Sequence, residues 1–372
     1  MSRVSLYRAE AYDPELLKGI VDAIIQDQGG YEKLFARGKK TVVKPNLVVK
    51  KKPEGSATTH PALLDAVLAC IQPYTDDITV AECSGGPNTE VLMTGIYRDC
   101  GITEVCEKYG VKLQKKLEGV PVTVADHLSL GEIDLLRDFV EADVFINLAK
   151  MKTHSLTTVT GAAKNLYGAV PGLKKVEYHA RFPELDDFAG LICDINRVLV
   201  PTLSLVDGIW GMEKEGPSGG EPKYCGVILG GTNTFAVDEV MCRCMGLDPA
   251  ISPILERAKK AGLFDGQVEI TGDPLTPAVP PFILPDSKKP SLLRDFPNLF
   301  GGRLARFLAP RPVIDKKKCV GCGECARLCP QKTIDIKDRK AHIREKKCIR
   351  CFCCQEMCPQ KAVVTKSRFV FR

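Results

Sequence analysis

Short apolar runs, each followed by a polar or glycine-rich turn, recur along the first two thirds of the chain. The first, Val4–Tyr7, alternates apolar and polar residues as a β-strand does. Five further strands are predicted at residues 41–43, 77–81, 144–147, 203–206 and 226–229. Between them, apolar residues recur at helical spacing, which predicts helices over residues 14–26, 61–71, 89–109, 188–199, 235–245 and 251–260.

Strands that alternate with helices predict an α/β domain with a mainly parallel sheet over residues 1–272. In such sheets ligands bind beyond the carboxyl ends of the strands, so the five turns are expected to form a pocket wall. From residue 273 to 312 nine prolines interrupt the pattern, which predicts a linker with one helix over residues 299–308. Residues 313–372 then form a second, small α+β domain.

Eight cysteines of the small domain repeat one spacing. Both Cys319–Pro330 and Cys348–Pro359 read C-x2-C-x2-C-x3-C-P, 29 residues apart, the spacing of bacterial two-cluster iron–sulfur runs. Three thiolates two residues apart can hold three corners of one cubane, because the residues between them form a tight loop. The repeat is too short to bury much core, so we expect bound clusters to stabilise this fold.

Structural zinc is the alternative for these cysteines, because zinc sites also use CxxC pairs. Four cysteines in one short run, twice over, exceed what a zinc site takes, so the spacing favours two [4Fe-4S] clusters. Cys353 is a surplus thiol in the second run. It is either a bystander or a ligand in a shifted register.

The net charge of +6 conceals an asymmetry. Residues 311–372 hold seventeen Lys or Arg and six Asp or Glu, a formal +11, which leaves −5 for residues 1–310. Thiolates around oxidised clusters would lower the tail by about four charges. The remaining positive face predicts contact with an acidic surface, either the α/β domain or a redox partner protein, unless it is only solvated. No nucleic-acid recognition motif accompanies the lysines, so nucleic acid is not an expected partner.

The N-terminus has no apolar signal segment, and no apolar run approaches the ~20 residues that span a bilayer. We therefore expect a soluble, cytoplasmic protein that does not bind a membrane. Nine of the 17 cysteines lie in the cluster region, and exposed clusters are lost under oxidising conditions, which favours a reducing, anaerobic cytoplasm.

Lysines, amides and glycines gather in the predicted turns, where charge and exposed N–H groups suit a small anionic ligand. The predicted ligand-binding residues are Lys44, Asn46, Gly85, Gly86, Lys150, Lys152, Lys164, Asn165 and Gly168. Ordinary surface lysines and turn glycines are the alternative for each. No GxGxxG or P-loop motif is present, so an organic cofactor stays undetermined.

Three residues near the predicted strand ends are candidate proton donors or acceptors. His154 is the first candidate for a general acid, followed by Tyr167 and Asp207. A single histidine of this kind is more often structural, which is the alternative for His154.

Residues 1–245 resemble the family known as domain of unknown function 362. The resemblance rests on Lys44-Pro45-Asn46, Lys152-Thr153-His154, Thr160–Gly168, and Asp207-Gly208 with Glu215-Gly216-Pro217. Ala149 and Lys214 depart from the family's pattern. The resemblance implies an iron–sulfur protein of anaerobic metabolism and leaves the substrate open.

The tail separately resembles two-cluster bacterial ferredoxins, in which the fourth cysteine of each run ligates the other cluster. This resemblance implies two ligand sets. Cluster one takes Cys319, Cys322, Cys325 and Cys358, and cluster two takes Cys348, Cys351, Cys354 and Cys329.

Three functions fit these features. The first is a reductase that passes electrons from the clusters to the anionic ligand, and that keeps ligand binding when the chain is cut at about residue 312. The second is an electron carrier whose large domain docks on a partner enzyme. The third is a scaffold or sensor in metallocofactor assembly.

Overall fold

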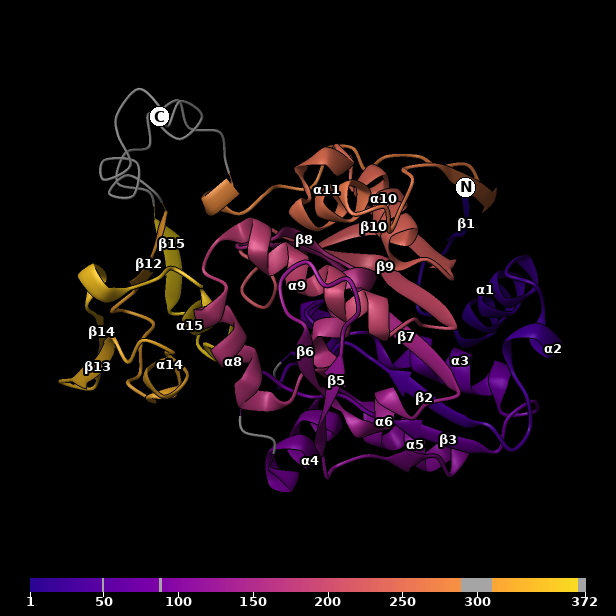
Figure 1. Ribbon diagram of the computed structural model, residues 1–372, viewed down its shortest axis with the longest axis horizontal. Coiled ribbons are helices and arrows are strands. Elements are labelled where there is room, and N and C mark those ends of the chain that lie inside the picture. The colour runs from indigo at the N-terminus through magenta and orange to yellow at the C-terminus, as the bar shows by residue number, and fades with distance from the viewer. Residues whose placement is uncertain (49, 87–88, 289–309, 367–372) are drawn as a thin grey trace.

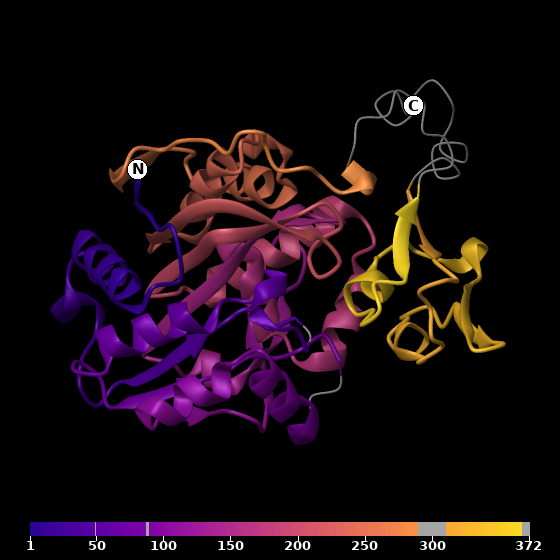
Figure 2. The same cartoon turned by 180° about the vertical axis from the view of Figure 1, so that it is seen from behind.

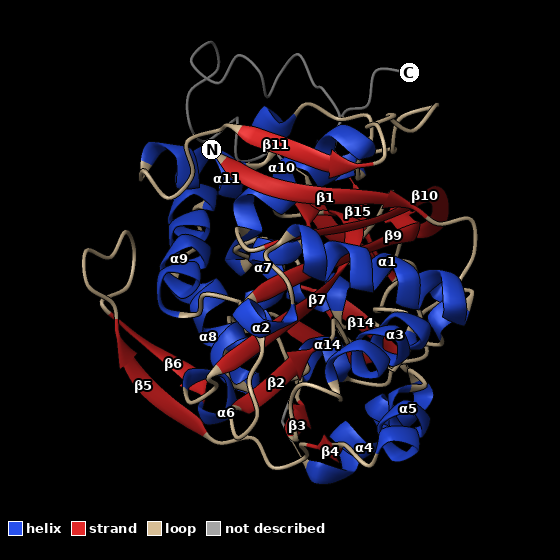
Figure 3. Ribbon diagram, turned by 90° about the vertical axis from the view of Figure 1, so that its right-hand side faces the viewer, coloured by secondary structure: helices blue, strands red, loops and turns tan. Residues whose placement is uncertain are grey.

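The computed structural model describes residues 1–48, 50–86, 89–288 and 310–366. They form a large α/β domain and a small C-terminal domain beside it (Figure 1). A nine-stranded sheet in the order β11-β1-β10-β9-β7-β2-β3-β4, with β8 paired to β7, forms the centre of the large domain. Figure 3 shows the strands in this order from top to bottom. The predicted fold class is confirmed.

The sheet is parallel from β9 to β4 and mixed elsewhere. Its strands are β1 (Ser2–Arg8), β2 (Lys40–Lys44), β3 (Asp77–Val80), β4 (Lys112–Leu113), β7 (Val144–His154), β8 (Thr158–Thr160), β9 (Leu203–Glu213), β10 (Glu221–Gly231) and β11 (Val268–Gly272). β10 runs antiparallel to both β9 and β1. The turn after β10 therefore lies at the opposite edge from the turns after β2, β3 and β7, and its predicted place in the pocket wall is wrong.

The two central strands are longer than predicted. β7 and β9 each extend over 11 residues, so the segments 150–154 and 207–211 are strand and not turn. Lys150 and Asp207 remain in the strands because their side chains form a buried ion pair, with 2.8 Å between Lys150 Nζ and Asp207 Oδ2. This pairing satisfies two charges that the sequence pattern assigns to a surface turn.

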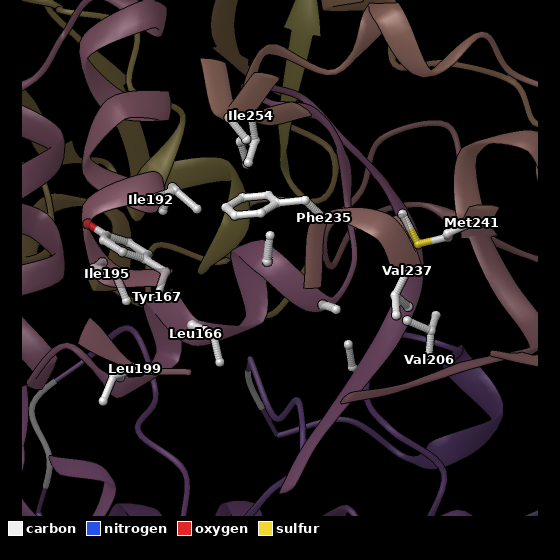
Figure 4. Packing of buried hydrophobic residues seen from close by; sticks show 14 of the residues in the cluster. Leu166, Tyr167, Ile192, Ile195, Leu199, Val206, Phe235, Val237, Met241 and Ile254 are labelled. Atoms are coloured by element: carbon white, nitrogen blue, oxygen red, sulfur yellow. The ribbon is translucent and has the colours of Figure 1, made fainter. Parts of the chain in front are cut away.

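Helices cover both faces of the sheet. They are α1 (Pro14–Asp27), α2 (Tyr31–Leu34), α3 (Pro61–Ile71), α4 (Glu90–Asp99), α5 (Ile102–Tyr109), α6 (Arg137–Val140), α7 (Ala162–Asn165), α8 (Gly172–Arg181), α9 (Leu185–Val198), α10 (Thr234–Cys244) and α11 (Pro253–Lys260). Alternate strand residues face different sides, so Val42 packs in the apolar cluster with α9 and α10, and Val43 packs in the cluster with α1 and α3. Figure 4 shows Ile192, Phe235 and Ile254 meeting in the first cluster.

Two of the helix predictions need comment. The helix expected over residues 89–109 is two helices, because Gly101 adopts a left-handed φ of 73° between α4 and α5. The helix expected over residues 299–308, with most of the Pro-rich linker, lies outside the described residues.

A separate hairpin of β5 (Gly119–Thr123) and β6 (Glu132–Leu136) lies beside the sheet and adds Ile133 and Leu135 to the first cluster.

The C-terminal domain is built from two short antiparallel pairs and two helical turns. These elements are β12 (Arg311–Ile314), α14 (Glu324–Arg327), β13 (Ile334–Lys337), β14 (Lys340–Ile343), α15 (Cys353–Glu356) and β15 (Val363–Lys366). β12 pairs with β15, and β13 pairs with β14. In both ribbon views α15 faces the α/β domain and the β13–β14 hairpin lies farthest from it (Figures 1 and 2).

Candidate functional site

A pocket lies where the carboxyl ends of the parallel strands meet α15. It encloses about 710 Å³, counting its open mouth. The predicted residues that line it are Asn46, Gly85, Lys152, Lys164, Asn165, Tyr167 and Gly168. Cys353, Glu356 and Met357 close it from the C-terminal domain. The pocket is therefore shared by both domains.

A buried ion pair supports the floor of the pocket. Lys44 Nζ lies 2.7 Å from Glu82 Oε2, and both side chains are almost fully buried. Burial lowers the pKa of Lys44, although the Glu82 carboxylate opposes that effect. Gly168 makes room for the pair, because a Cβ there would lie 2.3 Å from Lys44 Nζ. Gly168 is thus required by packing.

Two asparagines extend this floor to a second lysine. Asn46 donates to Asn165 Oδ1 at 2.8 Å and accepts from Lys152 Nζ at 2.6 Å. Lys152 Nζ also donates to the backbone carbonyl of Ala57 at 2.8 Å. Both acceptors are neutral, and burial, together with the charges of Lys164 and Lys150, lowers the pKa of Lys152 to about 7. A lysine with this pKa can hold or release a proton at Nζ near neutral pH.

Lys164 is the cation that faces the pocket without a bonded partner. Its half-buried side chain extends over the Tyr167 ring, with Nζ 5.7 Å from the ring centroid. In the part of the chain that the structure describes, Lys164 Nζ has no hydrogen-bonding partner. Burial lowers the pKa of Lys164, and the Glu356 carboxylate opposes this shift. An anionic ligand group would supply the missing contact.

His154 lies behind the pocket and contacts the C-terminal domain. Its Nδ1 accepts hydrogen bonds from the backbone N–H groups of Leu156 and Thr157, at 3.0 and 3.3 Å. The proton of the neutral imidazole is therefore on Nε2, which lies 3.2 Å from Glu356 Oε1. Burial and the charge of Lys164 lower the pKa of His154 to about 3. A buried, neutral imidazole outside the lining does not fit the predicted general acid, so we assign it a positioning role toward Glu356.

The other two proton-transfer candidates are also engaged elsewhere. Tyr167 lines the pocket with its ring, but its hydroxyl donates to the Lys175 carbonyl at 2.7 Å, and burial raises its pKa well above the usual value. Asp207 is paired with Lys150, accepts from the Tyr12 hydroxyl at 2.8 Å and does not line the pocket. Gly86, Lys150 and Lys44 also lie outside the lining, and of these only Lys44 supports it directly.

Glu356 and Met357 are pocket residues that sequence reasoning missed. The only signal is a difference between the two cysteine runs, since Arg327-Leu328 in the first run corresponds to Glu356-Met357 in the second. This difference places a carboxylate within electrostatic reach of Lys164, His154 and His179. Met357 packs on Gly85, where a Cβ would lie 2.8 Å from its sulfur atom.

Three further hydrogen bonds hold α15 and its neighbours on the α/β domain. Ser218 Oγ donates to the Glu356 carbonyl at 2.5 Å, and Gln355 Nε2 donates to Glu215 Oε2 at 2.8 Å. Lys361 Nζ donates to the Gly220 carbonyl at 3.2 Å. The loop between β9 and β10 therefore holds the small domain at the pocket.

The eight predicted cluster ligands surround two cavities inside the C-terminal domain. One cavity is lined by Cys319, Cys322, Cys325 and Cys358, and the other by Cys329, Cys348, Cys351 and Cys354. Backbone N–H groups of Ala341, Thr333 and Ala362 donate to the sulfur atoms of Cys319, Cys329 and Cys358 at 3.2–3.3 Å. Four thiols with such donors fit an iron–sulfur cluster. Cys353 lies in neither set and lines the interface pocket.

His179 gives the α/β domain a predicted sensitivity to acid. It stacks on Phe188 at 4.4 Å between ring centroids, and burial lowers its pKa to about 4. The unfolded chain takes up this proton near pH 6.5 and the folded chain near pH 4, so stability is lost as the pH falls between these values. We expect the free energy of unfolding to be about 2 kcal/mol lower at pH 5 than at pH 7 through His179 alone.

The measurement is the free energy of urea-induced unfolding at both pH values, monitored by the fluorescence of Trp210. Trp210 is the only tryptophan and lies in the α/β domain. The His179→Phe variant should lose about that much of the pH dependence. An equal pH dependence in the variant and the parent would show that His179 is not buried in its neutral form.

The chain was compared with known protein families. Residues 41–243 match the family model described as domain of unknown function (DUF362), and residues 311–359 match a 4Fe-4S dicluster domain. The chain belongs to the DUF362 family. The C-terminal region is an iron–sulfur domain of the ferredoxin type, which supports electron transfer as its role.

Three similar proteins show how far the likeness extends. A thylakoid-associated protein of Synechocystis sp. is 27% identical over 269 residues, which are 72% of this chain and 82% of that protein. An uncharacterized ferredoxin of Methanocaldococcus jannaschii is 52% identical over 31 residues, which are 8% of this chain and 20% of that protein. The lactate racemase apoprotein of Thermoanaerobacterium thermosaccharolyticum is similar in structure with a TM-score of 0.40 and 13% identity, over 66% of this chain and 57% of that one. No helix in the described ranges is long and apolar enough to span a membrane.

Proposed function

We propose that this DUF362 protein is a reductase that passes electrons from two [4Fe-4S] clusters to a small anionic ligand in the interface pocket. The ligand sets are the two groups of four cysteines that surround the cavities. The proposal includes a division into an α/β domain (1–272), a linker (273–312) and a cluster domain (313–372). It also includes a reducing, anaerobic cytoplasm, because Cys322 is exposed.

The observation that carries the proposal is the double use of α15. This helical turn begins at Cys353, which lines the pocket, and continues directly into Cys354, which belongs to the second cysteine set. Cys351, another member of the second set, lies two residues before Cys353. A ligand in the pocket would therefore lie next to the group of cysteines proposed for cluster two.

Charge and proton supply in the pocket agree with a reduction. When bound, two clusters supply one electron each, and a ligand that takes up both electrons also takes up two protons. Lys164 Nζ has no bonded partner among the described residues and is suited to hold the anionic group, whereas Lys152 Nζ, with its lowered pKa, is suited to deliver one proton. The second proton comes from water at the open mouth of the pocket. The substrate class implied by this set is a small carboxylate or other anion with a reducible centre.

Native mass spectrometry of the full chain, purified without oxygen, tests the proposal. We expect the mass above that of the bare chain to equal two [4Fe-4S] clusters plus a small organic anion. Two clusters with no further mass, even after incubation with small carboxylates, would contradict the ligand site and favour the electron-carrier alternative. Zinc in place of iron would contradict the proposal as a whole.

A further inference from the structure

The outer face of the C-terminal domain carries many lysines and arginines, and the interface with the α/β domain carries few. Polar contacts between the domains use Gln355, Glu356 and Lys361. Lys361 is the basic residue of the small domain among these three. Among the residues that the structure describes, Lys317, Lys318, Lys337 and Arg339 form no hydrogen bond or ion pair with the α/β domain.

Basic residues from two segments meet around the first cysteine run. Lys316–Lys318 are exposed and precede Cys319 directly. The β13–β14 turn brings Lys337 and Arg339 to the same loop, because a Cβ on Gly321 would lie 2.4 Å from the Arg339 carbonyl oxygen. Two lysines join the segments, since Lys316 Nζ donates to the Ala341 carbonyl and Lys340 Nζ to the Cys319 carbonyl, both at 2.6 Å.

Exposed apolar side chains lie next to these basic residues in the chain. Val320 and Ile336 are 53% and 38% exposed, and both line the cavity of the first cysteine set. Cys322 of that set is itself exposed. We call this surface the cluster-one face and define it by Val320, Cys322 and Ile336 with Lys317, Lys318, Lys337 and Arg339.

The second cysteine set lacks a comparable surface. Lys346 and Lys347 are exposed before Cys348, but among the described residues no exposed large apolar side chain lines its cavity. On another side of the second set, Cys353 lines the interface pocket with the α/β domain. Of the two cysteine cavities, only the one formed by Cys319, Cys322, Cys325 and Cys358 thus has both exposed apolar side chains and exposed basic residues beside it, among the residues described.

We infer that a small acidic one-electron carrier protein docks on the cluster-one face and delivers electrons there. An apolar centre with a charged rim is the usual composition of a transient interface, and complementary charge steers the encounter. One electron leaves the donor and one reaches the first cluster, so the charge balances without another reactant. The inference rests on the proposed iron–sulfur function, but it does not depend on the ligand of the interface pocket.

The test compares two charge reversals in the full-length, cluster-loaded protein. The probe is a flavodoxin, an acidic one-electron carrier, and its binding in the oxidised state is measured by calorimetry at low and high salt. We expect Lys317→Glu with Lys318→Glu to weaken binding at least tenfold at low salt and to remove most of the salt dependence. The matched pair Lys346→Glu with Lys347→Glu should change binding less than threefold.

Stopped-flow bleaching of the clusters gives a second readout. Reduction by flavodoxin hydroquinone should slow in the same order, while the iron content stays unchanged. If the double Glu variant loses iron, Lys317→Gln with Lys318→Gln replaces it, with an expected loss of about threefold. Equal effects of the two pairs, or parental binding that is insensitive to salt, would overturn the inference. Lys164→Met should leave flavodoxin binding unchanged, which separates this inference from a failure of the ligand site.

Discussion

Replacing Lys164 with methionine is expected to weaken the binding of small anions in the interface pocket about thirtyfold. Lys164 Nζ has no hydrogen-bonding partner in the described structure, so its ammonium is available to a ligand. A hydrogen bond from a charged group stabilises by about 1.5–3 kcal/mol, and thirtyfold corresponds to about 2 kcal/mol. Methionine keeps an unbranched apolar side chain of similar size and removes the ammonium group. The measurement is anaerobic calorimetry with a panel of small dicarboxylates and inorganic phosphate.

Two companion variants sharpen this result. Lys174→Met removes an exposed lysine of α8 that is paired with Asp134 at 3.2 Å, and it should leave anion binding unchanged. Glu356→Gln removes a negative charge near Lys164 and keeps the size of the side chain beside His154, so it should tighten anion binding about tenfold. Equal losses in Lys164→Met and Lys174→Met would show a general charge effect and contradict the assigned anion site.

Removal of iron is expected to unfold the C-terminal domain and leave the α/β domain folded. The apolar cluster of the small domain consists of Ile334, Ala341, Ala362, Val363 and four cysteines. Half of the residues in this core are thus cysteines, which the clusters would hold together. The four aliphatic residues are too few to stabilise the domain alone. The α/β domain has two apolar clusters of its own that contain none of these cysteines.

Hydrogen–deuterium exchange before and after anaerobic chelation measures this effect. Peptides within residues 311–366 should exchange fully after chelation, a loss of protection of more than a hundredfold. Peptides from β7 and β9 should exchange as before. A C-terminal domain that keeps its protection without iron would contradict both the cluster-dependent core and the ligand assignment that rests on it.

The sequence predicted the parts of this structure that depend on local pattern. Apolar periodicity was sufficient for α1, because Leu17, Ile20, Val21, Ile24 and Ile25 form its buried face and Asp13 caps it. The resemblance of the tail to two-cluster bacterial ferredoxins was sufficient to group eight thiols in the two sets that line separate cavities. Among the predicted pocket residues, Asn46, Lys152 and Lys164 come together because each lies near the carboxyl end of a strand or on the turn that follows.

The features that depend on partners distant in sequence were not predictable in this way. Lys150 and Asp207 looked like turn residues, and only the pairing of β7 with β9 shows that they neutralise each other inside the sheet. The direction of β10 depends on its two neighbours. His154 looked like an acid because its partners, two backbone N–H groups and Glu356, could not be known from the motif. The expectation that ligand binding survives a cut at about residue 312 also changes, because Glu356 and Met357 would be lost with the tail.

The double use of α15 has a consequence for the order in which the protein matures. One wall of the ligand pocket belongs to the same helical turn as Cys354. If iron removal unfolds the tail as expected, this wall would form only after iron has been inserted. A newly made chain could fold its sheet first, but it would become able to bind a ligand later, at a rate set by the insertion of the clusters. Iron supply would then decide what fraction of these molecules can bind a substrate, even when the amount of polypeptide is constant.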